Sequence, residues 1–332
     1  MTRVLSGIQP TGDIHLGNYL GALRQWAVDQ HEHDSFYCAV DLHAVTVQQN
    51  PEDLRSKTLE TMATLVAVGL DPEVCTLFVQ SHVTYHTELS WLLECTVSFG
   101  ELRRMTQFKD KSTKQGDAGQ EHVSAGLFTY PALMAADILI YDADRVPVGD
   151  DQRQHLELTR DIAERFNSRY GETLVLPSAA IPKIAARVMD LQEPTNKMSK
   201  STESAAGAVG IFEDTKSIAK KFKRAVTDSD NDVRFDFETK PGVSNLLSIL
   251  GAATDRDPET LADQYSQYGP LKSDAADAVI SVLEPVQKRR SELLADPAEL
   301  DRIIARGADK ASEVAAETVQ RAKNAMGFLP LN

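Results

Sequence analysis

The sequence is poor in cysteine and in aromatic residues. Its 332 residues include three cysteines, and aromatic side chains make up only 6% of the chain. Cys38, Cys75 and Cys95 are odd in number, far apart and without the spacing of metal ligands. This pattern argues against a disulfide framework and against a cysteine metal site. We interpret all three as buried free thiols that pack in the core of a protein from a reducing cytoplasm.

The chain also lacks a long apolar run. Its first residues give no secretory signal, since polar turn residues follow soon after Arg3. The best candidate for a membrane span, residues 125–141, is interrupted by Pro131 and Asp137. We therefore expect a cytoplasmic protein with no membrane partner.

A third deficit is positive charge. With 35 Lys and Arg against 49 Asp and Glu, the chain has a formal net charge of −14, which argues against a general nucleic-acid binder. Basic residues nevertheless gather within residues 101–114 and 183–224, and the acidic excess lies elsewhere, notably in the C-terminal third. An acidic body repels nucleic acid, so any such contact must depend on a few local groups.

A glycine-punctuated stretch occupies residues 7–18, Gly-Ile-Gln-Pro-Thr-Gly-Asp-Ile-His-Leu-Gly-Asn. It follows an apolar run typical of a strand, and it precedes residues 19–26, whose apolar positions recur at helical spacing. Backbone N–H groups and the positive end of a helix dipole converge at such a turn, which makes it an anion site. Taken alone, the stretch could equally be an ordinary strand-to-helix loop.

A second stretch, Asn-Lys-Met-Ser-Lys-Ser at residues 196–201, places two lysines three positions apart among small and flexible residues. By itself it is typical of a solvated cationic loop. Together, the two stretches resemble the paired signatures of the class I aminoacyl-tRNA synthetases, known as HIGH and KMSKS. The second signature is complete, and the first reads His-Leu-Gly-Asn, with Asn18 in place of the last histidine. This variation fits the tryptophan branch of the class.

The resemblance to the tryptophan branch extends along most of the chain. Segments similar to its bacterial members lie, in matching order and spacing, at residues 7–12, 17–22, 105–109, 134–139, 146–152, 225–229 and 324–327. This series is far more specific than either signature alone. It implies an enzyme that activates L-tryptophan with ATP, releases pyrophosphate and transfers tryptophan to the 3′ end of tRNA(Trp).

Strand and helix patterns alternate in the first half of the chain, which predicts an α/β fold with a Rossmann-like parallel sheet. The loops at residues 9–18, 41–43 and 149–152 each follow a predicted strand, so we expect them to meet in one crevice at the carboxyl ends of the strands. Helix patterns dominate after residue 211. We place residues 1–211 in a catalytic domain and residues 212–332 in a helical domain, which by resemblance binds the tRNA anticodon.

The resemblance also implies which residues bind ATP. His15 and Asn18 of the first signature, and Lys197 and Lys200 of the second, would be catalytic, because the reaction needs charge stabilised on the phosphates as pyrophosphate leaves. Mg²⁺ would accompany ATP and bridge its phosphates, without a dedicated protein metal site. The full ATP-binding set is Gln9, Pro10, Thr11, Gly17, Asn18, Gly149, Asp150, Asp151, Val188, Lys197, Met198, Ser199, Lys200 and Ser201.

Asp137 carries the hypothesis for amino-acid specificity. It stands inside an apolar segment, residues 133–140, where a carboxylate is costly without partners. In an arbitrary protein, a locally bonded aspartate at a helix end would be the alternative. Under the resemblance, Asp137 accepts a hydrogen bond from the indole N–H, which is only a donor. The tryptophan pocket would be completed by Tyr130, Met134, Gln152 and His43.

Three other functions remain open at this point. A tyrosyl-tRNA synthetase shares both signatures, although residues 134–139 and 146–152 favour tryptophan. A tRNA- or nucleotide-binding paralogue without charging activity would be expected to lose the signature lysines, which are both present. A small-molecule nucleotidylyltransferase would not need the long helical region. The resemblance further implies a homodimer, and residues 288–290, Lys-Arg-Arg, are a candidate tRNA contact or a solvated face.

Overall fold

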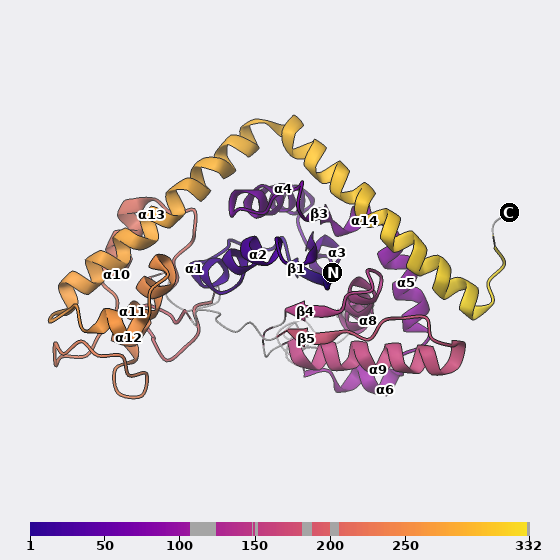
Figure 1. Ribbon diagram of the computed structural model, residues 1–332, viewed down its shortest axis with the longest axis horizontal. Helices are drawn as coiled ribbons and strands as arrows, with labels where there is room; N and C mark the ends of the chain where they lie inside the picture. The colour runs from indigo at the N-terminus through magenta and orange to yellow at the C-terminus, as the bar shows by residue number, and fades with distance from the viewer. Residues whose placement is uncertain (107–123, 148, 150–151, 181–187, 200–205, 331–332) are drawn as a thin grey trace.

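The computed structural model describes residues 1–106, 124–147, 149, 152–180, 188–199 and 206–330 (Figure 1). Five strands form one parallel sheet in the order β3-β2-β1-β4-β5. They are β1 (Arg3–Ile8), β2 (Asp34–Ala39), β3 (Thr76–Val79), β4 (Arg145–Pro147) and β5 (Ser178–Ala180). Because β1 lies between β2 and β4, the strand order reverses beside β1. A crevice forms at the carboxyl end of β1 at this point. The predicted parallel α/β sheet is confirmed.

Helices cover both faces of this sheet. Alternate residues of β2 point to opposite sides, so Tyr37 packs in one apolar cluster and Phe36 in the other. Among the helices before residue 211, those that contribute to Tyr37's cluster are α1 (Leu16–Asn18), η1 (Tyr19–Leu23), α2 (Arg24–Asp29) and α4 (Pro51–Ala67). The other cluster draws on α5 (Tyr85–Glu94), α6 (Phe99–Arg104), α8 (Ala125–Leu139) and α9 (Arg153–Tyr170). Two short elements, α3 (Asp41–Ala44) and η2 (Gln80–His82), follow the ends of β2 and β3.

Local chemistry explains where α4 begins and ends. The side chain of Asn50 accepts hydrogen bonds from the N–H groups of the first turn, and Pro51 occupies the first helical position, where no N–H is needed. The helix stops before Gly69, whose φ of 107° lies in a region that side chains rarely adopt.

Five helices follow residue 211: α10 (Thr215–Lys223), α11 (Pro241–Thr254), α12 (Pro258–Ala262), α13 (Tyr268–Ala295) and α14 (Pro297–Met326). The last two form a long arch over the molecule (Figure 1). In α14, Gly307 lies against the backbone of Leu77 in β3, where a Cβ would clash. Ala311, Ala315 and Val319 then pack in the same apolar cluster as α5 and α8. The helical region is therefore not one separate bundle, because its last helix completes the core around the sheet.

The interpretation of the cysteines needs one correction. Cys38 and Cys75 are buried free thiols, but Cys95 is exposed, because it follows the last residue of α5 and faces solvent. No helix among the described residues is long and apolar enough to cross a membrane.

Candidate functional site

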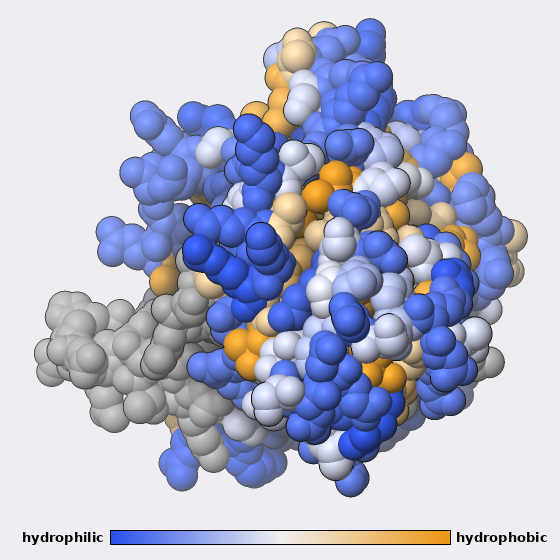
Figure 2. All heavy atoms as spheres, turned by 90° about the vertical axis from the view of Figure 1, so that its left-hand side faces the viewer, coloured by the Kyte–Doolittle hydropathy of each residue, from blue (hydrophilic) through white to orange (hydrophobic). Residues whose placement is uncertain are grey.

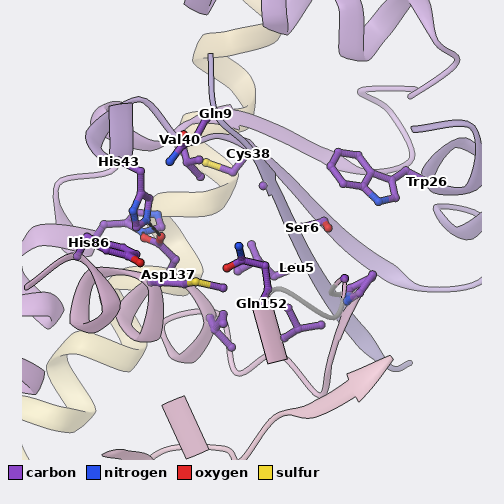
Figure 3. Close-up of a pocket in the computed structure, with 17 residues that line it drawn as sticks. Leu5, Ser6, Gln9, Trp26, Cys38, Val40, His43, His86, Asp137 and Gln152 are labelled. Carbon is purple, nitrogen blue, oxygen red and sulfur yellow. Dashed lines mark hydrogen bonds and ion pairs between the residues drawn. The ribbon is translucent and has the colours of Figure 1, made fainter. Parts of the chain in front are cut away.

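A cavity of about 400 Å³ lies at the carboxyl ends of β1, β2 and β4, beside helix α8. Figure 3 shows Gln9, His43, Asp137 and Gln152 around it. Gln9, His43 and Gln152 come from the three loops that the sequence predicted to meet, so the expected crevice is confirmed. Its lining consists of Leu5, Ser6, Gly7, Gln9, Trp26, Cys38, Val40, His43, His86, Tyr130, Met134, Asp137, Ile138, Val146, Pro147, Gly149 and Gln152.

Asp137 is the charged centre of the cavity. The residue is only 6% exposed, and three side chains donate to its carboxylate. His43 Nε2 lies 2.7 Å from Oδ2, while Gln80 Nε2 and His86 Nδ1 each lie 2.7 Å from Oδ1. Burial alone would raise the pKa of Asp137, but the charge and hydrogen bond of His43 and the hydrogen bond of His86 outweigh it and hold the pKa well below its usual value. The group therefore stays ionised and can only accept hydrogen bonds.

Helix α8 presents three of the predicted tryptophan-pocket residues on one face, because Tyr130, Met134 and Asp137 follow helical spacing. The hydroxyl of Tyr130 lies 2.8 Å from Nε2 of His155. Burial raises the pKa of Tyr130 to about 12, so its phenol stays neutral. Gln152 enters from the turn after β4, where its N–H donates to the carbonyl of Gly149 at 3.0 Å.

The sequence reasoning missed Gln80, His86 and Tyr141. His86 Nε2 lies 2.7 Å from the hydroxyl of Tyr141, and all three residues are buried. One signal could have found Gln80, since it follows directly after the strand Thr76–Val79 at the same sheet edge as the other loops. His86 gives no such signal, because it faces the site from the first turn of helix α5.

The first signature stands beside the segment that follows residue 187. His15 caps α1, and its Nδ1 accepts from the N–H of Asn18 at 3.3 Å. A Cβ on Gly17 would lie 3.0 Å from the His15 ring and 3.6 Å from Cβ of Val188, so only glycine fits without displacement. The N–H of Leu16 donates to the carbonyl of Val209 at 2.7 Å.

The second signature is anchored to the same place. Met198 is 1% exposed, and its N–H donates to the carbonyl of Val188 at 3.1 Å. Lys197 is exposed and Ser199 is half-buried. In this loop, the fixed apolar residue Met198 therefore lies between Lys197, a cation that faces solvent, and Ser199.

Other predicted ATP residues have different outcomes. Pro10 is buried and Thr11 is half-buried in the loop after Gln9, and neither lines the cavity. Asp150, Asp151, Lys200 and Ser201 lie outside the described residues. Within the described part of the chain, no group of three or more His, Cys, Asp or Glu side chains could hold a metal ion.

Comparisons with known proteins identify the family of this chain. The family model described as tRNA synthetases class I (W and Y) matches residues 1–284. A tryptophan–tRNA ligase 2 of Streptomyces avermitilis is 54% identical over 331 residues, covering 99% of this chain and 97% of that protein. A tryptophan–tRNA ligase of Leifsonia xyli is 55% identical, covering 98% and 97%.

Solved structures of tryptophanyl-tRNA synthetases have the same fold as this chain. Tryptophanyl-tRNA synthetase of Mycoplasma pneumoniae has a TM-score of 0.91 at 37% identity and covers 99% of this chain and 98% of that one. The enzyme of Campylobacter jejuni, in complex with ADP and tryptophan, has a TM-score of 0.83 at 34% identity and covers 98% and 100%.

Proposed function

The chain belongs to the class I tRNA synthetases for tryptophan and tyrosine and is a tryptophan–tRNA ligase, and from this premise we propose that the cavity beside α8 is its tryptophan pocket. The observation that carries this proposal is the ionised, buried carboxylate of Asp137 in the cavity wall. An indole N–H can only donate, and Asp137 can only accept. Tyr130, Met134, Gln152 and His43 enclose the rest of the ring.

ATP lies against the first signature and is met by the second. Gln9, at the mouth of the cavity, joins the tryptophan pocket to the loop of Pro10 and Thr11. The close approach of Gly17 to Val188 forms the adenine side of the site. Asp150 and Asp151 belong to this site only by resemblance. Mg²⁺ enters with ATP as part of the substrate and is held by phosphate oxygens and water.

The chemistry needs alignment and positive charge rather than a nucleophilic side chain. The carboxylate of tryptophan attacks the α-phosphate, and pyrophosphate leaves. Met198 holds the lysine loop to Val188, while Lys197, Lys200 and the first-signature residues His15 and Asn18 offset the charge that develops on the phosphates. A terminal adenosine hydroxyl of tRNA(Trp) then attacks the activated carbonyl.

Asp137→Ala tests the tryptophan pocket. Pyrophosphate exchange is measured for the parent and the variant, each with tryptophan and with the analogue that carries sulfur in place of the indole N–H. We expect a loss of roughly 2 to 4 kcal/mol in kcat/KM for tryptophan, the scale of a charged hydrogen bond plus misalignment. The analogue should lose far less, because it never donated to Asp137. Equal losses for both substrates would remove Asp137 from the specificity assignment.

The helical region after residue 211 binds tRNA, and helix α10 supports this assignment. Lys216, Lys220 and Lys223 are exposed, lie on one face of α10, and form no ion pair among the described residues. The candidate cluster at residues 288–290 is less suitable. Arg289 pairs with Glu299 at 2.6 Å, and Arg290 pairs with Glu60 at 3.0 Å while its guanidinium stacks on an aromatic ring.

Salt dependence of tRNA affinity tests the α10 surface. A variant with glutamine at Lys216, Lys220 and Lys223 should bind tRNA(Trp) more weakly, and its log affinity should fall less steeply with log salt, by about 0.7 to 0.9 for each lost phosphate contact. Pyrophosphate exchange, which needs no tRNA, should not change. A control variant with the same loss of charge has glutamine in place of Arg55, Arg169 and Arg302. These arginines are exposed and form no ion pair among the described residues. An equal change in slope for both variants would contradict the assignment.

The protein acts in the cytoplasm as a homodimer that is formed through the outer surface of α5 and α6. Trp91 and Phe99 are 65% and 69% exposed there, and a second, shallower cavity contains Trp91 and Tyr130. Figure 2 shows a different face of the molecule, on which apolar side chains lie scattered among polar ones. Solitary exposed apolar residues are common, but a large one in the wall of a hollow, as Trp91 is here, favours an interface. Trp91→Glu should lower the sedimenting mass to that of one chain. A parent enzyme that sediments as a monomer would refute the dimer.

A further inference from the structure

Three buried polar side chains lie around Asp137, and one of them, His86, also lines the cavity. We propose that Gln80, His86 and Tyr141 are positioning residues, which turn one oxygen of Asp137 toward the indole N–H of tryptophan. The inference rests on the tryptophan pocket proposed above and assigns a task to residues outside the binding signatures. Gln80, His86 and Tyr141 are each at most 1% exposed.

The two oxygens of Asp137 are not equivalent. A carboxylate offers about two acceptor positions on each oxygen. Oδ1 receives two donors, Gln80 Nε2 and His86 Nδ1, both at 2.7 Å, so it has no position left. Oδ2 receives one donor, His43 Nε2 at 2.7 Å. Oδ2 is therefore the oxygen with a position free for the substrate. Figure 3 shows the rings of His43 and His86 converging on the carboxylate at the edge of the cavity.

The contacts of His86 determine where its proton sits. Because ionised Asp137 has no hydrogen, Nδ1 of His86 must carry the proton of that hydrogen bond. Nε2 of His86 is then left to accept from the hydroxyl of Tyr141, which lies 2.7 Å away. Burial raises the pKa of Tyr141 well above its usual value, so its phenol keeps the hydrogen that it donates. Tyr141 thus selects the histidine tautomer that donates to Asp137.

Packing holds this chain of hydrogen bonds in one position. The ring of Tyr141 stacks on Phe36 of β2, with centroids 4.7 Å apart, and meets Phe78 of β3 edge-on at 5.5 Å. The second donor to Oδ1, Gln80, is also held in place. The N–H of Leu42 donates to Oε1 of Gln80 at 3.1 Å, which turns the amide so that Nε2 faces Asp137. The sheet and helix α3 therefore both resist rotation of the carboxylate.

Rigidity of this kind improves discrimination. A carboxylate that is free to turn can find other donors when the indole N–H is missing, whereas a fixed one leaves its open position buried and unpaired. Loosening Oδ1 should therefore affect tryptophan more than the analogue with sulfur in place of N–H. A purely structural role would affect both amino acids equally.

Tyr141→Phe provides the test, and Tyr37→Phe is its matched control. Both tyrosines are fully buried in the parent and use their hydroxyl as a donor, but Tyr37 donates to the carbonyl of Trp26 and not toward Asp137. Pyrophosphate exchange gives kcat/KM for tryptophan and for the sulfur analogue in each variant. We expect the ratio of the two values to fall about threefold or more in Tyr141→Phe, the effect of one weakened hydrogen bond, and to stay at the parent value in Tyr37→Phe.

The outcomes separate the two proposals. An unchanged ratio in Tyr141→Phe, with the ratio lost in Asp137→Ala, overturns the positioning role and leaves the tryptophan pocket intact. A ratio unaffected by Asp137→Ala overturns the pocket itself. Equal falls in both phenylalanine variants show a general effect of core packing and also overturn the positioning role. If Tyr141→Phe does not fold, Gln80→Met removes one donor to Oδ1 at similar side-chain length and must lower the ratio in the same way.

Discussion

Removal of the Asp137 carboxylate should lower the melting temperature of the protein as well as impair the recognition of tryptophan. Asp137→Ala leaves His43, Gln80 and His86 with buried donors and no acceptor. Each orphaned group costs about 1 to 3 kcal/mol, but costs within one network do not add. Loss of one partner from a buried charged pair costs about 3 to 5 kcal/mol. We take that range as the expected loss in the free energy of unfolding.

Thermal unfolding without substrates measures this loss. For a chain of 332 residues, an unfolding entropy of about 2.1 cal/mol/K per residue means that 1 kcal/mol shifts Tm by roughly 1 to 2 °C, so Tm should fall on the order of 3 to 10 °C. Asp277→Ala is the control, because Asp277 is exposed on helix α13 and forms no ion pair within the described residues. A variant at Asp137 that melts with the control would refute the reasoning that its carboxylate is the common acceptor of three donors.

Three further predictions follow from single side chains. Lys197→Ala should lower kcat for pyrophosphate exchange by about 100-fold with little change in tryptophan affinity, since Lys197 lies outside the tryptophan cavity; equal losses would show that the loop only binds substrate. The hydrogen bond from Arg165 lowers the pKa of Glu101 to about 2, below the unfolded value of about 4.3. The ionised Glu101 carboxylate therefore contributes stability above about pH 4.3, and this contribution is lost as the pH falls toward 2. The free energy of urea unfolding of Glu101→Gln should accordingly depend less on pH in that interval than that of the parent. A maleimide should label Cys95 in the native protein and the other two thiols only after unfolding, as mass spectrometry can count.

The sequence by itself determined the parts that follow from local pattern. Strand and helix periodicity indicated the parallel sheet, and the rule for strand ends was enough to bring Gln9, His43 and Gln152 to one crevice. A carboxylate inside an apolar helical segment marked Asp137, because such a group is costly unless it has partners. Motif order identified the family, and the full-length relatives confirm it.

Only the tertiary structure decided which partners Asp137 has. Gln80 and His86 are 57 and 51 residues away from it in the chain, and no periodicity links them. The same holds for α14, which returns across β3 to complete the core, and for Arg290, which joins helix α13 to Glu60 of helix α4. The periodicity of apolar residues in the sequence indicates which face of an element is buried. A hydrogen bond between distant side chains depends instead on how those faces are packed together.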